Sequence, residues 1–119
     1  MSDMTMTLIG RTRRTGSVSG AQLEEWIVYG PAPLIVDVRD AWQYRQGHLD
    51  LAENIPVRTH AAMLVERVPD DGLLVLVCED GLFSREVARM LEFCGLRQVV
   101  WLEGGMKSWN AARVQRKAA

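Results

Sequence analysis

The sequence has 119 residues, of which 48% are hydrophobic and 24% charged, as in a soluble globular domain large enough for a real core. The formal net charge of -1 gives no bulk electrostatic reason to bind nucleic acid or an anionic membrane, and no apolar run reaches the about 18 residues of a membrane span. Two cysteines are too few for a disulfide scaffold, so we expect free thiols and a cytoplasmic protein.

The two ends of the chain carry the weakest pattern. Residues 1–17 are polar and are predicted to form a solvated N-terminal arm, with a short strand at 6–10 as the alternative. A single domain is expected over residues 18–113. Residues 114–119 are predicted to be a frayed basic tail.

A helix is predicted to begin at Ser19, which forms a capping box with Gln22. Its apolar positions share one face, which we expect to be buried: Leu23, Trp26 and Ile27. Gly30 and the prolines after it end the helix. The following run at 34–38, LIVDV, is apolar enough to be a central strand.

The middle of the chain is predicted to contain two helices and a connection. Asp40 can cap a short helix that runs to Gln46 and ends at Gly47. A connection follows, with a short strand at 54–57, and a second helix is predicted over 59–68.

A strand, a tight loop and a helix follow between residues 73 and 95. The run LLVLV at 73–77 is apolar at every position, which favours a strand buried on both faces. From Phe83 the period becomes helical, and Gly95 can end the helix. The predicted inner face holds Phe83, Val87, Met90, Leu91 and Cys94, and the predicted outer face holds Ser84, Arg85, Glu86, Arg89 and Glu92.

The last predicted elements are a strand at 98–102, a bend over 103–105 and a helix over 106–113 with Trp109 on its inner face. Strands thus alternate with helices along the whole domain. This alternation predicts an α/β fold with a mostly parallel sheet covered on both sides.

Cys78 is the candidate nucleophile, because it stands where a buried strand passes into a helix. Ligands of open α/β sheets bind at the carboxyl ends of strands, beside helix N-termini. The thiolate is the reactive form of cysteine, and loop N–H groups at a helix N-terminus favour the anion. The alternative is a loop-end core cysteine. Cys94, on the apolar helix face, is predicted to be core.

Three motifs together resemble the rhodanese family. They are DVRDAWQYRQGHLDLAENIP from Asp37, CEDGLFS from Cys78 and LEGGMKSW from Leu102. The resemblance implies a three-layer α/β/α domain with a mostly parallel five-stranded sheet. It also implies transfer of sulfane sulfur through a persulfide on Cys78, from thiosulfate or a related small donor to cyanide, a thiol or an acceptor protein. No cofactor or metal is implied.

The resemblance also suggests which residues form the site. Cys78 would be catalytic, and the loop after it would bind the substrate: Glu79, Asp80, Gly81, Leu82, Phe83 and Ser84. The N–H groups from Glu79 to Ser84 would hold the anionic sulfur. Asp37, Arg39 and Arg85 would support the site. For Asp37 and Arg39 structural support, through an ion pair or through bonds to the loop backbone, is preferred over direct substrate contact. His48 either fixes the turn after Gly47 or acts as a general base.

The loop departs from the family pattern at two positions. Active rhodaneses often carry arginine where this chain has Glu79 and Phe83. Glu79 and Asp80 would oppose the thiolate if they face the pocket, and the sequence leaves their direction open. An alternative function is therefore a rhodanese-like binding or sulfur-relay module with little turnover on thiosulfate.

Overall fold

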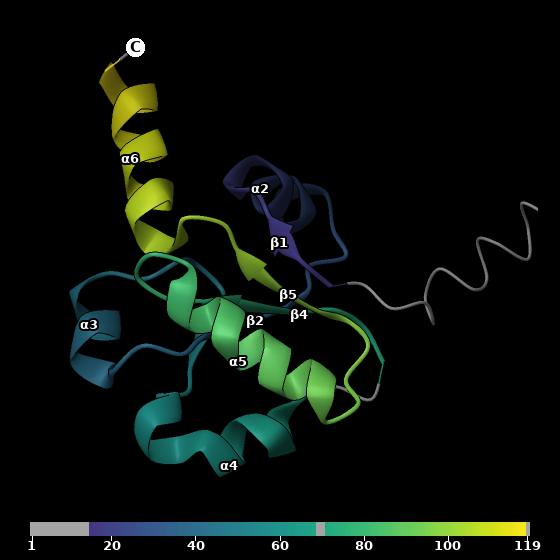
Figure 1. The fold of residues 1–119 in the computed structure, drawn as a ribbon. Helices are drawn as coiled ribbons and strands as arrows, with labels where there is room; N and C mark the ends of the chain where they lie inside the picture. Colours follow the sequence, from purple (N-terminus) through teal and green to yellow (C-terminus); the bar gives the residue numbers. More distant parts are fainter. Residues whose placement is uncertain (1–14, 69–70, 119) are drawn as a thin grey trace, which may run out of the picture.

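The computed structural model describes residues 15–68 and 71–118. The elements in this part of the chain are β1 (Ser17–Val18), α2 (Gly20–Tyr29), β2 (Leu34–Asp37), α3 (Ala41–Gln46), β3 (Glu53–Asn54), α4 (Val57–Arg67), β4 (Leu74–Val77), α5 (Leu82–Phe93), β5 (Val99–Leu102) and α6 (Gly105–Ala118). Most of the predicted N-terminal arm, including the alternative strand at 6–10, lies outside the described residues. Figure 1 shows strands and helices alternating along the chain.

The strands form one five-stranded sheet in the order β1-β5-β4-β2-β3. All four neighbouring pairs are parallel. The central pair is in register from Leu34 opposite Leu74 to Asp37 opposite Val77, so β2 and β4 end side by side. The predicted α/β class and parallel five-stranded sheet are confirmed.

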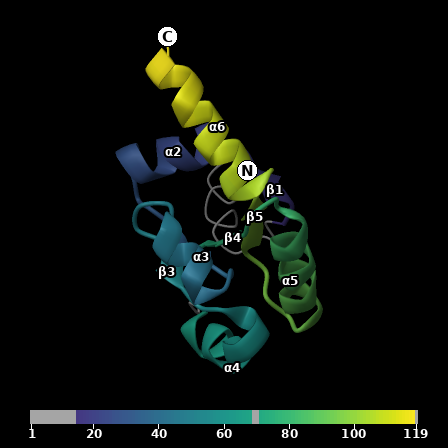
Figure 2. The same ribbon diagram turned by 90° about the vertical axis from the view of Figure 1, so that its left-hand side faces the viewer.

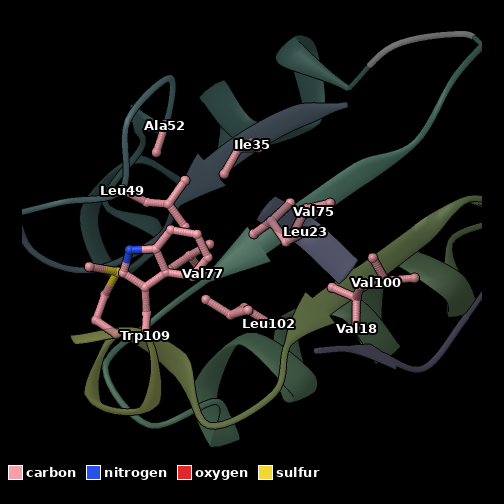
Figure 3. Packing of buried hydrophobic residues seen from close by; sticks show 11 residues of the cluster. Val18, Leu23, Ile35, Leu49, Ala52, Val75, Val77, Val100, Leu102 and Trp109 are labelled. Carbon is pink, nitrogen blue, oxygen red and sulfur yellow. The ribbon is translucent and has the colours of Figure 1, made fainter. Parts of the chain in front are cut away.

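The core has two halves, one on each face of the sheet, because neighbouring residues of a strand point to opposite faces. Val75 and Val77 of β4 belong to the half that includes Leu23 and Trp109, part of which is shown in Figure 3. Leu76 belongs to the other half, with side chains of α4 and α5. Figure 2 shows α5 on one side of the sheet and α2 and α3 on the other. The predicted three-layer arrangement follows from this alternation.

Two of the predicted helix caps are present. The Ser19 hydroxyl accepts the Gln22 N–H at 3.1 Å. Asp40 precedes α3, and its own N–H donates to Gln43 Oε1 at 3.3 Å. These bonds satisfy N–H groups that the first turn of a helix leaves unpaired.

Several boundaries differ from the sequence prediction. β1 was not expected, and it pairs with the edge of β5 through Ser17 and Val18. The short strand after the connection lies at Glu53–Asn54, earlier than the predicted 54–57. α4 begins at Val57, two positions before the predicted start at residue 59. α6 continues to Ala118, so the predicted frayed tail after residue 113 is helical.

The predicted faces of α5 are partly wrong. Val87 and Leu91 are buried as expected, but Met90 is 69% exposed. Cys94 is exposed, because it follows the last residue of α5, beyond the part of the helix that packs on the sheet. Ser84, predicted to face solvent, is fully buried.

No helix in the described ranges is both long enough and apolar enough to cross a membrane.

Candidate active site

The loop from Cys78 to Gly81 joins the carboxyl end of β4 to the N-terminus of α5. Since the strands are parallel, the ends of β2 and β5 lie at the same edge of the sheet. The segments after these strands therefore surround the cysteine, as expected for a site in an open α/β sheet.

The sulfur of Cys78 lies between two backbone N–H donors and two side-chain oxygens, those of Ser84 and Asp80. The residue is 2% exposed, and its Sγ accepts the N–H of Gly81 at 3.1 Å and the N–H of Ser84 at 3.2 Å. The thiol also donates to Ser84 Oγ at 3.2 Å, and that hydroxyl donates to the carbonyl of Gly81 at 3.3 Å. Two fixed N–H groups, at the start of a helix, stabilise a negative charge on sulfur.

Of the six N–H groups in the predicted cradle, those of Gly81 and Ser84 bond to the sulfur. The N–H of Leu82 donates to Asp80 Oδ1 at 3.0 Å, and the Leu82 side chain is 58% exposed. The prediction that every N–H from Glu79 to Ser84 holds the sulfur is therefore wrong. The carboxylate of Asp80 takes the Leu82 N–H, and the hydrogen bonds to Sγ come from Gly81 and Ser84.

The bend before α6 holds the loop in place. The carbonyls of Cys78 and Glu79 accept the N–H groups of Met106 and Lys107 at 2.9 and 3.0 Å. A Cβ at Gly105 would lie 2.5 Å from the Cys78 carbonyl oxygen, so only glycine permits this approach. The glycines of the third sequence motif thus allow α6 to begin directly against the loop.

Asp37 and Arg39 form the predicted ion pair. Arg39 Nη2 lies 2.8 Å from Asp37 Oδ2, and the carboxylate is fully buried. Arg39 also donates to the carbonyl of Gly47 at 2.8 Å and to Glu79 Oε1 at 3.2 Å. Burial would lower the pKa of Arg39, but hydrogen bonds and charge from Asp37, and then from Glu79, hold this pKa above its ordinary value. Through Glu79, Arg39 links the segment after β2 to the loop after β4.

A pocket of about 140 Å³ opens beside the cysteine. Its lining residues come from the segment after β2, the active loop and the helices α3, α4 and α5: Val38, Arg39, Asp40, Gln43, Arg58, Cys78, Glu79, Asp80 and Phe83. Glu79 and Asp80 are both among the lining residues. With Asp40 they give the lining three carboxylates against the two guanidinium groups of Arg39 and Arg58, a balance that opposes the binding of a small dianion.

Arg58 is a lining residue that the sequence prediction missed. It lies in the first turn of α4, and its Nη1 is 3.1 Å from Asp40 Oδ2. No local pattern indicated this position. It is near Cys78 only because α4 begins where β2 and β4 end.

Two further candidates, Arg85 and His48, also lie outside the pocket lining. Arg85 is paired with Glu86 at 3.6 Å, so its expected supporting charge is offset by that partner. The ring of His48 stacks on Tyr44 with centroids 3.6 Å apart, and its Nδ1 is 2.8 Å from the Tyr44 carbonyl. This geometry favours the interpretation that His48 fixes the turn after Gly47 over a function as a general base. Within the described residues, no group of three or more His, Cys, Asp or Glu could hold a metal ion.

Comparison with known proteins agrees with the fold and the motifs. A sequence model of the family described as Rhodanese-like domain matches residues 19–112. The chain is 35% identical over 78 residues to the thiosulfate sulfurtransferase GlpE of Shewanella oneidensis, covering 66% of this chain and 76% of that protein. It is 28% identical over 94 residues to the probable adenylyltransferase/sulfurtransferase MoeZ of Mycobacterium tuberculosis, covering 78% of this chain but only 24% of MoeZ.

A solved structure of a rhodanese-related protein has a similar fold. The crystal structure of a rhodanese-related protein from Thermoplasma volcanium superposes with a TM-score of 0.70 at 27% identity, over 81% of this chain and 91% of that one. The family match runs from Ser19, before α2, to Ala112 in α6, and includes the loop of Cys78 and the glycine bend. The chain therefore belongs to the rhodanese-like family.

Proposed function

We propose that this chain is a sulfurtransferase that carries sulfane sulfur as a persulfide on Cys78. The observation that carries the proposal is the convergence of two N–H donors and one hydroxyl on Sγ, beside an open pocket. Family membership and the names of the relatives support a sulfur-transfer reaction. Thiosulfate is the donor that the name of the GlpE relative suggests.

The proposed first step is attack of the Cys78 thiolate on the outer sulfur of thiosulfate. A sulfur–sulfur bond forms at Sγ, the bond to the sulfonate sulfur breaks, and sulfite leaves with the bonding electrons. The product is a persulfide anion, which the N–H groups of Gly81 and Ser84 are placed to stabilise. Cyanide or a thiolate then removes the outer sulfur and restores the thiolate. No cofactor enters these steps.

A second candidate function is a binding or relay module with little turnover on thiosulfate. It is favoured by the carboxylates of the pocket lining, Asp40, Glu79 and Asp80, which outnumber the two guanidinium groups of that lining. Such a pocket would suit an acceptor or donor protein that presents a cationic surface.

The test is sulfur transfer from thiosulfate to cyanide, together with an intact mass spectrum after thiosulfate treatment. We expect the wild type and Cys94→Ser to gain one sulfur mass and to form thiocyanate. Cys78→Ser should do neither. A sulfur that maps to Cys94, or turnover retained by Cys78→Ser, would refute the proposal. Persulfide formation without multiple turnovers would favour the relay module.

A further inference from the structure

Two guanidinium groups line the pocket, and they differ in what they can bind. The Arg39 side chain is 7% exposed and is held by Asp37, by the Gly47 carbonyl and by Glu79. Its charge already faces two carboxylates at 2.8 and 3.2 Å. Arg39 therefore has little capacity left for a ligand.

Arg58 is in the opposite situation. Its side chain is 71% exposed and forms an ion pair with Asp40, whose side chain is 28% exposed. An exposed ion pair adds little to the free energy of unfolding, because water screens both charges and the long side chain loses conformational freedom. The guanidinium can therefore leave Asp40 for another anion at small cost.

The backbone that carries Arg58 is fixed at the edge of the pocket. The N–H of Val57 donates to the carbonyl of Val38 at 3.4 Å, and the N–H of His60 donates to the carbonyl of Pro56 at 2.7 Å. His60 has non-helical dihedral angles, φ -132° and ψ 37°, which separate this first turn from the rest of α4. The turn thus holds its position beside β2 while the side chain extends into the pocket lining.

We propose that Arg58 is the residue that binds the oxyanion end of the sulfur donor, and that Asp40 competes with the donor for it. This inference rests on the proposed sulfurtransferase function and adds the residue that selects donors carrying a sulfonate over donors without one. In the resting protein Asp40 neutralises Arg58. When a donor enters, its sulfonate replaces Asp40 on the guanidinium, and its outer sulfur is directed to Cys78. A planar guanidinium suits this exchange, because it binds oxyanions through two parallel N–H groups.

The experiment compares Arg58→Gln with Arg67→Gln, in the persulfide-forming reaction. Arg67 is a matched control, because it lies on the same helix, has a 48% exposed side chain, and forms an ion pair with Glu53 away from the pocket lining. Two donors are used: thiosulfate, and cysteamine persulfide, which carries no oxyanion. With thiosulfate, Arg58→Gln should lower kcat/KM roughly tenfold, mainly through KM, as expected for one charge-assisted contact. Arg67→Gln should not change it.

Asp40→Asn should change kcat/KM for thiosulfate in the opposite direction to Arg58→Gln. The amide keeps the polar group before α3 but no longer neutralises Arg58, so kcat/KM for thiosulfate should rise roughly threefold at low salt and less at high salt. In the double variant with Arg58→Gln this gain should vanish, since the two residues act on one contact.

The outcomes separate the inference from the function on which it rests. Equal kcat/KM for Arg58→Gln and Arg67→Gln with thiosulfate would overturn the inference alone. An equal loss with both donors would also overturn it, because it would show a structural effect. A wild type that accepts sulfur from neither donor would refute the proposed function and the inference with it.

Discussion

Gly81→Ala tests whether the backbone shape of the active loop carries the chemistry. Gly81 has φ +89°, and a Cβ at this residue would lie 2.9 Å from the N of Gly104 and 3.2 Å from the carbonyl oxygen of Leu102. Both contacts are backbone, so the loop itself must move. The N–H of Gly81 is one of the two that bind Sγ, at 3.1 Å, and the same movement would withdraw it from the sulfur.

Two effects of different size are expected. The left-handed conformation alone should cost about 1–2 kcal/mol of the free energy of unfolding. Loss of one preorganised donor should lower the rate of persulfide formation by about a hundredfold or more. Thermal or urea unfolding measures the first effect, and single-turnover mass spectrometry with thiosulfate measures the second.

Gly95→Ala is the matched control at the other end of α5. Gly95 has φ +106°, and a Cβ there meets nothing within 4 Å. We expect a similar loss of stability, about 1–2 kcal/mol, and an unchanged rate of persulfide formation. If Gly81→Ala formed persulfide at the wild-type rate, the argument that this N–H stabilises the sulfur anion would be wrong.

Three further changes test the charge, the second thiol and the pH response. Glu79→Gln keeps a partner for Arg39 but removes a pocket charge, so kcat/KM for thiosulfate should rise roughly threefold at low salt and less at high salt; an equal gain at both would contradict the electrostatic reason. Cys94→Ser should shift the free energy of unfolding by less than about 0.5 kcal/mol, since the side chain is exposed, and a larger loss in urea unfolding would show hidden packing. Burial, with the charges of Asp37 and Glu53, raises the pKa of Tyr44, whose hydroxyl donates to a carbonyl at 2.5 Å. The Tyr44 hydroxyl should therefore make its full contribution to the free energy of unfolding below about pH 10 and lose it as the pH rises further. Above that pH, the difference in urea midpoint between wild type and Tyr44→Phe should become smaller. A constant difference would show that this hydroxyl does not control the alkaline response.

The central sheet could be predicted because its strands are buried on both faces. Runs such as 73–77 are apolar at every position, and few other structures need that pattern. β1 could not be predicted, because a strand of two residues is too short to show an alternation of apolar and polar side chains. Ser17 and Val18 are a strand only because the edge of β5 offers them parallel hydrogen bonds.

Site residues that lie in one continuous chain segment could be predicted, whereas a residue that reaches the site from a distant segment was missed. Cys78 and the glycine of its loop follow from the passage of a strand into a helix. Ser84 was placed on the wrong face, because helical periodicity treats serine as a solvent-facing residue. Its burial is possible because its N–H and hydroxyl are both bonded. The contact of Arg58 with the pocket depends on how α4 packs at the sheet edge, and no spacing in the sequence encodes it.

Two hydrogen bonds from the start of α6 to the active loop connect this helix to the surroundings of the Cys78 sulfur. The peptide groups of Cys78 and Glu79 that accept the N–H groups of Met106 and Lys107 belong to the residues nearest the reacting sulfur. A persulfide on Cys78, as proposed, would change the electric field at those carbonyls. We therefore expect the amide resonances and isotope-exchange rates of Met106 and Lys107 to differ between the thiol and the persulfide. Both residues lie in the first turn of α6, the helix that projects from the body of the domain in Figure 1.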